Sequence, residues 1–183
     1  MSARTAGFAV LALALADTSC TSSSELTTTS GAEPPTETST TDSPTVSTAE
    51  HVYARVAPSI ASIDTDIAGG SGILIDRSTV LTAAHVVWPY QSVRVVFPSG
   101  TEIRDAPVIG TDLFGDLALI DVSGVANAPA PVEIGDGEGI PLGRPVYLVG
   151  YPGESEAFPQ PTITEGILSR TREWEGEEWT FLQ

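Results

Sequence analysis

Two side chains in this sequence, His85 and Asp116, stand where they could carry out chemistry. His85 follows a short β-branched run, residues 79–82, and two alanines too small to shield an imidazole stand directly before it. An imidazole exposed at a strand end is available for proton transfer, whereas one in the core would be satisfied by a backbone carbonyl. Asp116 stands at the mouth of an apolar strand, where it either carries function or only forms a turn, as expected of Asp112 and Asp121.

Six short β-type runs, separated by Gly, Pro, Asp and Ser, surround these two side chains. Short strands at such close spacing predict a small antiparallel barrel. The clearest hairpin joins residues 93–97 to residues 101–103 through Pro98-Ser99-Gly100. A short helix over residues 51–57, ended by Pro58, is expected before the first strand. The six strands are expected at residues 59–64, 71–76, 79–82, 92–97, 101–110 and 117–122.

The second half begins with an Ala-, Pro- and Gly-rich stretch, residues 123–143, which we interpret as the crossing to a second barrel. Strands are expected at residues 146–150 and 162–168, and a third begins at Trp179. Three strands do not close a barrel, so we expect these residues to belong to a longer protein. The acidic tip, residues 172–179, is interpreted as a hairpin turn with two paired tryptophans, the alternative being a recognition loop for basic peptides.

Three segments of the first half occur in a recognisable order. They are residues 70–75 (Gly-Ser-Gly-Ile-Leu-Ile), 81–87 (Leu-Thr-Ala-Ala-His-Val-Val) and 116–119 (Asp-Leu-Ala-Leu). Together they resemble the trypsin-like serine peptidases, and specifically the HtrA/Deg-like bacterial branch. The histidine and the aspartate lie 31 positions apart, which suits the first barrel of that family. The resemblance implies an all-β, chymotrypsin-like double barrel, with the first barrel complete and the second partial. It continues over residues 149–153, 163–169 and 181–183.

The same resemblance implies roles for both side chains. His85 would be the general base and acid, and Asp116 would hold its tautomer and stabilise the imidazolium. A serine hydroxyl is a poor nucleophile until a base takes its proton, so the pair alone cleaves nothing. The family's Gly-x-Ser-Gly-Gly loop occurs nowhere in the 183 residues, and its place falls shortly after Gln183. The same segment would supply oxyanion-hole N–H groups, so we expect these residues alone to be inactive and the longer protein to be active.

Ser71, which lies between glycines, is the tempting substitute for that nucleophile. Its surroundings, Gly69-Gly70-Ser71-Gly72-Ile73, lack the second glycine of a Gly-x-Ser-x-Gly elbow, and no helical pattern follows. A hydrolase of the α/β type is therefore not indicated. We expect Ser71 to begin a barrel strand, with the glycines allowing close backbone packing.

Charge and metal-ligand content exclude several classes of function. The net charge is −16, from 24 acidic and 8 basic residues, and this balance repels phosphate backbones and anionic lipid surfaces. No nucleic-acid partner is expected. The two histidines are His51 and His85, and Cys20 falls in the export region, so a zinc site would rest largely on carboxylates. We expect neither a metal nor another cofactor.

The N-terminus has the build of an export signal. Arg4 precedes an apolar run ending at Ala16, which is far shorter than the ~20 residues that span a bilayer. Cys20, the single cysteine, resembles the lipidated cysteine of bacterial lipoproteins, although Asp17 stands where that class has an aliphatic residue. Lipid attachment at Cys20 and simple secretion both stay open. Either way we expect the mature protein outside the cytoplasm, in the cell envelope or the extracellular space.

These features divide the chain into four parts. They are a signal peptide (residues 1–20), a disordered Ser/Thr/Pro-rich linker (21–49), a first barrel (50–125), and a crossover with a partial second barrel (126–183). The leading hypothesis is an exported trypsin-like serine endopeptidase that cleaves protein or peptide substrates through a Ser-His-Asp triad. The alternative is a non-catalytic cell-envelope scaffold of the same fold that binds peptides or proteins.

Overall fold

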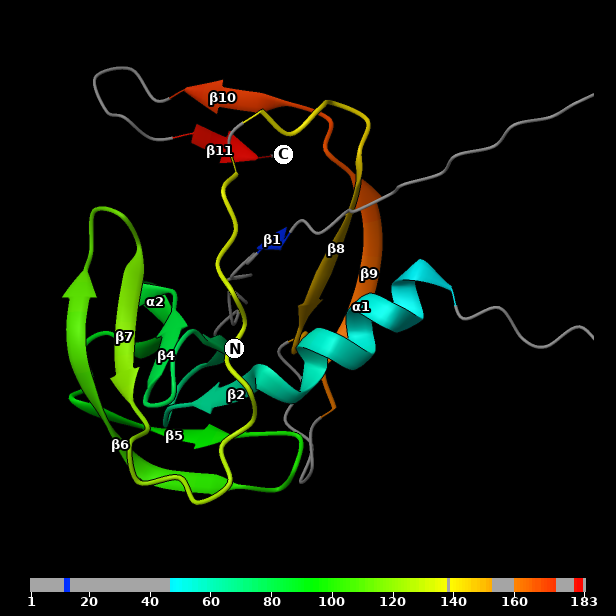
Figure 1. Cartoon of the computed structure of the whole chain (residues 1–183). Coiled ribbons are helices and arrows are strands. Elements are labelled where there is room, and N and C mark those ends of the chain that lie inside the picture. The colour runs from blue at the N-terminus through cyan, green and yellow to red at the C-terminus, as the bar shows by residue number, and fades with distance from the viewer. Residues whose placement is uncertain (1–11, 14–46, 138, 153–159, 174–179, 183) are drawn as a thin grey trace, which may run out of the picture.

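A computed structural model describes residues 12–13, 47–137, 139–152, 160–173 and 180–182 (Figure 1). The main body begins with helix α1 (Thr48–Val56), which Ser47 caps. The Ser47 hydroxyl accepts the N–H of Glu50, and the Glu50 carboxylate accepts the N–H of Ser47. α1 therefore starts earlier than the predicted helix. It ends in a 3₁₀ turn, η1 (Ala57–Ser59), which contains Pro58.

Six strands close into an antiparallel barrel in the order β2-β3-β4-β7-β6-β5 (Figure 1). The predicted barrel is therefore confirmed, and each strand lies within two residues of its expected place. The hairpin between β5 and β6 is also confirmed, with Gly100 at a φ of 82° in its turn. The strands are β2 (Ile60–Asp64), β3 (Gly69–Leu74), β4 (Thr79–Thr82), β5 (Ser92–Val96), β6 (Glu102–Asp112) and β7 (Leu117–Asp121).

Branched aliphatic side chains fill the barrel interior. Ile63, Val80, Val95 and Ile120 are fully buried there, each from a different strand. Gly72 makes room for two of them, because a Cβ at this position would lie 2.5 Å from Val80 Cγ1 and 2.6 Å from Ile63 Cδ1. The missing side chain in β3 thus lets the side chains of β2 and β4 meet.

A second sheet lies beside the barrel and has the order β1-β8-β9 (Figure 1). β8 (Pro145–Gly150) and β9 (Thr162–Ile167) confirm two expected strands. β1 (Ala12–Leu13) pairs with the other edge of β8 and falls within the stretch interpreted as an export signal. Cys20 and residues 21–46 of the predicted linker lie outside the described residues. No helix in the described ranges has the length and apolarity needed to cross a membrane.

A separate two-stranded ribbon lies near the C-terminus. β10 (Thr171–Glu173) and β11 (Thr180–Leu182) pair antiparallel, with Glu173 opposite Thr180. β11 begins one residue after the expected third strand, and β10 was not predicted. The tryptophans of the predicted turn lie outside the described residues.

The second sheet is joined to the barrel through a small apolar cluster. Val52 and Val56 of α1 pack there with Ile73 of β3 and with Tyr147 and Val149 of β8. The connection between the barrel and β8 runs along the barrel as an irregular segment (Figure 1). Residues 123–143, interpreted as the crossing, contain neither helix nor strand in their described part.

Candidate active site

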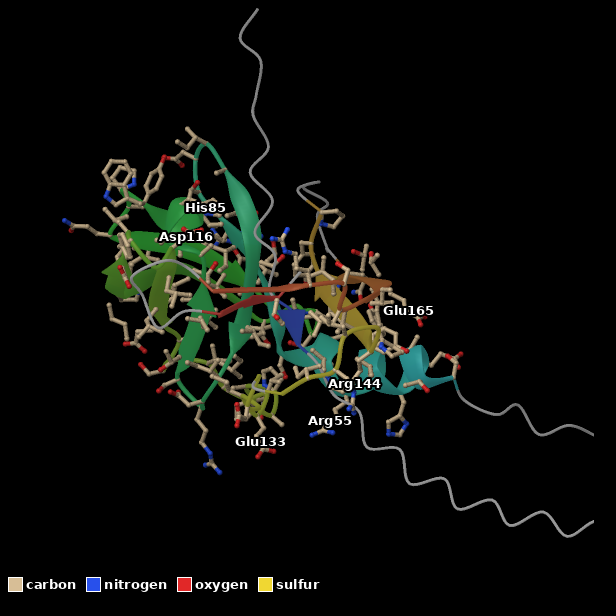
Figure 2. The ribbon with its side chains drawn as sticks, turned by 90° about the horizontal axis from the view of Figure 1, so that it is seen from above. Arg55, His85, Asp116, Glu133, Arg144 and Glu165 are labelled. Carbon is tan, nitrogen blue, oxygen red and sulfur yellow. The ribbon has the colours of Figure 1, made fainter. Side chains whose placement is uncertain are left out.

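The imidazole of His85 lies outside the barrel because its neighbours are held inside. β4 leads directly into α2 (Ala84–Val87), a single helical turn. Ala84, Val86 and Val87 of this turn are buried, whereas 43% of the His85 side chain is exposed. Three buried anchors around one exposed residue leave the ring at the barrel surface, close to Asp116 (Figure 2).

Asp116 ends the turn between β6 and β7. Its backbone has a φ of 53°, a left-handed conformation that residues with a side chain seldom adopt. About half of its side chain, 51%, is exposed. β7 begins at the next residue, so the carboxylate is fixed to the end of a barrel strand, as the sequence indicated.

The two side chains meet in one hydrogen-bonded arrangement. His85 Nδ1 lies 2.7 Å from Asp116 Oδ2, and the backbone N–H of His85 donates to Asp116 Oδ1 at 2.9 Å. The N–H of Ala84 donates to the Asp116 carbonyl oxygen at 3.1 Å. An ionised carboxylate can only accept, so this contact favours the tautomer with its hydrogen on Nδ1. Both carboxylate oxygens of Asp116 are thus directed at His85.

These contacts bear on the alternatives that the sequence left open. His85 is not a core histidine bonded to a backbone carbonyl, since its ring is partly exposed and contacts a carboxylate. Asp116 does more than form a turn, because both of its carboxylate oxygens accept hydrogen bonds from His85. The structure brings together the two residues that the sequence pattern paired, and their catalytic roles stay a prediction.

Gly70 of β3 also shapes the site, and sequence reasoning gave it no more than a packing role. A Cβ on Gly70 would lie 2.7 Å and 2.8 Å from the two Cγ atoms of Val86. Val86 follows His85 in α2, so the turn that carries the imidazole rests against the bare backbone of β3. Glycines ahead of an apolar run were the available signal for this close approach.

The hydroxyl of Ser71 makes a structural hydrogen bond within the fold. It is the third residue of β3, two residues after the strand begins, and its hydroxyl accepts the N–H of Tyr151 at 2.8 Å. The bond ties the barrel to the residue that follows β8. Burial, helped by the negative charges of Tyr53 and Asp64 when ionised, raises the pKa of Tyr151 to about 12.

The histidine and acidic residues of the described segments do not gather elsewhere into a metal site. No three His, Cys, Asp or Glu side chains within these segments are grouped so that they could hold a metal ion. His51 lies exposed on α1, and Cys20 lies outside the described residues.

Comparison with known proteins places both site residues inside a matched region. Residues 70–182 match a family model described as the trypsin-like peptidase domain. The chain is 32% identical over 136 residues to "Serine protease PepD" of Mycobacterium tuberculosis, covering 66% of this chain and 28% of that protein. It is 30% identical over 104 residues to "Serine protease HtrA-like" of Staphylococcus aureus, covering 55% of this chain and 13% of that protein. The chain therefore spans less than a third of the length of these relatives.

Proposed function

This chain belongs to the trypsin-like peptidase domain family, and from that premise we propose that it supplies the base and the orienting carboxylate of a serine endopeptidase. One observation carries the proposal. His85 Nδ1 and Asp116 Oδ2 lie 2.7 Å apart within the matched region, with a second carboxylate oxygen bound to the backbone N–H of His85. Both contacts are those that a proton-transferring imidazole needs in order to stay aligned.

The proposed reaction is acyl transfer from a peptide bond to a serine hydroxyl. His85 Nε2 takes the hydroxyl proton as the oxygen attacks the scissile carbonyl, and the imidazolium then gives that proton to the leaving amine. Water repeats the sequence to release the acyl group. Asp116 stays ionised throughout and stabilises the imidazolium through the Nδ1–H bond.

The proposal needs a nucleophilic serine in addition to His85 and Asp116. The Gly-x-Ser-Gly-Gly sequence is absent from residues 1–183, and the Ser71 hydroxyl is engaged by the Tyr151 N–H. The proposal therefore requires that the complete reading frame encode the serine and the N–H groups that stabilise the oxyanion. We infer protein substrates from membership of the peptidase family. The two relatives are themselves named serine proteases.

We also propose that the protein acts outside the cytoplasm. The support is the charged start and short apolar run of residues 1–16, followed by a Ser/Thr-rich stretch. Lipid attachment at Cys20 and release after cleavage are the two forms of this proposal. Mass spectrometry of the mature N-terminus distinguishes the two forms. In the first form the mature chain begins at Cys20, which carries a lipid. In the second form Cys20 is unmodified. A mature protein that retains residues 1–16 would contradict export through this signal.

The catalytic proposal is tested by a fluorophosphonate probe, which labels only an activated serine. We expect the product of the complete reading frame to be labelled, and the His85→Ala variant to lose labelling. His51→Ala is the matched control, since it removes the other histidine, and it should label normally. A glycine or alanine at the serine position, or no labelling of the folded protein, overturns the proposal. Either result would favour a peptide-binding scaffold without catalysis.

A further inference from the structure

The turn between β6 and β7 is held from within by Asp112. Its Oδ1 accepts the N–H groups of Phe114 and Gly115, each at 3.0 Å. Asp112 also pairs with Leu117 across the β6–β7 ladder, so its own backbone is anchored in the barrel. One carboxylate oxygen therefore ties the middle of the turn to the strand that precedes it.

Asp116 depends on this support more than an ordinary turn residue would. Its φ of 53° lies in the left-handed region, which aspartate enters more readily than most residues but still at a cost in energy, so contacts that hold the turn favour it. The apolar side chains of the turn do not supply them, because Leu113 is 62% exposed and Phe114 is 75% exposed. The two bonds to Asp112 help to hold the turn before Asp116, beside the bonds that Asp116 itself makes with Ala84 and His85.

The position of Asp116 in turn decides that of the His85 ring. Asp116 receives hydrogen bonds from the His85 ring, from the His85 backbone and from the N–H of Ala84. A shift of the turn by about 1 Å would break the contact between Nδ1 and Oδ2, because hydrogen bonds weaken steeply outside their narrow range. We propose that Asp112 is a positioning residue that sets the tautomer of His85 through Asp116. This inference rests on the proposed function for its purpose, although its test does not need catalysis.

The test reads the tautomer of neutral His85 from the NMR signals of its ring nitrogens, in mildly alkaline solution, using the product of the complete reading frame. We expect the Nδ1–H form in the natural chain, because the carboxylate accepts that hydrogen. Asp112→Ala should raise the fraction of the Nε2–H form several-fold, because the carboxylate of Asp116 then no longer fixes the hydrogen on Nδ1. Asp112→Asn keeps an acceptor oxygen at the same place and should restore the Nδ1–H form. His51 serves as the internal reference.

Asp121→Ala is the matched control. Asp121 Oδ1 accepts the Ser123 N–H at 2.8 Å in the turn at the other end of β7, so its loss removes a similar bond away from His85. In the Asp121→Ala variant, His85 should keep the tautomer that it has in the natural chain. If Asp112→Ala does not fold, Asp112→Glu decides the matter, because it keeps the charge but moves the carboxylate by one methylene.

Two results would overturn the inference. Folded Asp112→Ala or Asp112→Glu with the natural tautomer would show that the turn holds without this carboxylate. An equal change in Asp121→Ala would show a general loss of order in place of a positioning effect. Failure of the proposed function appears elsewhere, as absent fluorophosphonate labelling with a normal tautomer. The two proposals are therefore contradicted by different measurements, the positioning role by the tautomer of His85 and the catalytic role by the labelling.

Discussion

At the scale of single residues, Asp116 makes two kinds of contact with His85. One oxygen binds the ring and the other binds the backbone, so ring and turn are oriented by the same carboxylate. Asp116→Asn keeps the shape of the side chain but can present an NH₂ group to Nδ1, which stabilises the wrong tautomer. We expect the rate of peptide hydrolysis by the complete protein to fall by about 10⁴-fold. Asp121→Asn is the control, and a loss below tenfold for Asp116→Asn would argue against the role of this residue.

A second effect at this scale concerns the phenol of Tyr151. Burial raises its pKa to about 12 in the folded protein, whereas an unfolded tyrosine ionises near pH 10. The folded state therefore holds the proton more tightly, and the free energy of unfolding should fall as the pH rises from about 10 to about 12. Below pH 10 this residue should cause no pH dependence.

Urea denaturation at a series of pH values measures this effect. Tyr151→Phe has no proton to lose, so its stability should depend less steeply on pH in that window than the stability of the natural chain. Equal slopes for the two proteins would show that the phenol titrates normally. Absorbance near 295 nm on the same samples reports tyrosine ionisation directly.

At the scale of elements, the approach of β3 to α2 depends on Gly70. Gly70→Ala would place a methyl group against Val86, at distances that require the side chain and its turn to move. We expect a loss of about 1–3 kcal/mol in the free energy of unfolding, the usual cost of overpacking. The labelling of the complete protein should also slow, because His85 moves with α2.

Gly110→Ala provides the comparison for this change. Gly110 lies in β6, where an added Cβ would meet Leu119 at 3.8 Å, an ordinary contact. We expect its effect on stability to stay within about 0.5 kcal/mol. Equal destabilisation by the two substitutions would mean that the loss comes from strand glycines in general and not from the contact with α2.

The bounds of the helices and strands also show which features could be predicted from neighbouring residues in the sequence. β4 was predicted at its observed bounds, because a short β-branched run follows the turn residues Asp76 and Ser78 and gives way to two alanines. β3 begins two residues before its predicted start, since Gly69 and Gly70 pair with β2 but carry no apolar signal. The start of α1 was readable, because Ser47 and Glu50 have the spacing of a capping box, yet the prediction did not use it.

At the scale of the whole molecule, Ser71 joins the barrel to the second sheet. Ser71→Ala would leave the Tyr151 N–H without its acceptor in a partly buried place. We expect a loss of about 1–3 kcal/mol in the free energy of unfolding, together with faster hydrogen exchange at the Tyr151 amide. Ser99→Ala, which removes an exposed serine bonded to Thr101, should change neither. An unchanged exchange rate in Ser71→Ala would contradict this account of the connection.

Long-range contacts of this kind mark the limit of what the sequence could predict. The sequence paired His85 with Asp116 because the order and spacing of the motifs that contain them resemble those of the trypsin-like peptidases. The φ of Asp116 and the bond between Ser71 and Tyr151 depend on segments brought together only by folding. Such details follow from tertiary packing, which has no local signature in the chain.

The barrel closes its ring of hydrogen bonds with strands β2 to β7 alone. His85 and Asp116 lie on connections between strands of that barrel, His85 in α2 and Asp116 in the turn between β6 and β7. A single run of the chain, residues 79–121, therefore brings the imidazole and the carboxylate together.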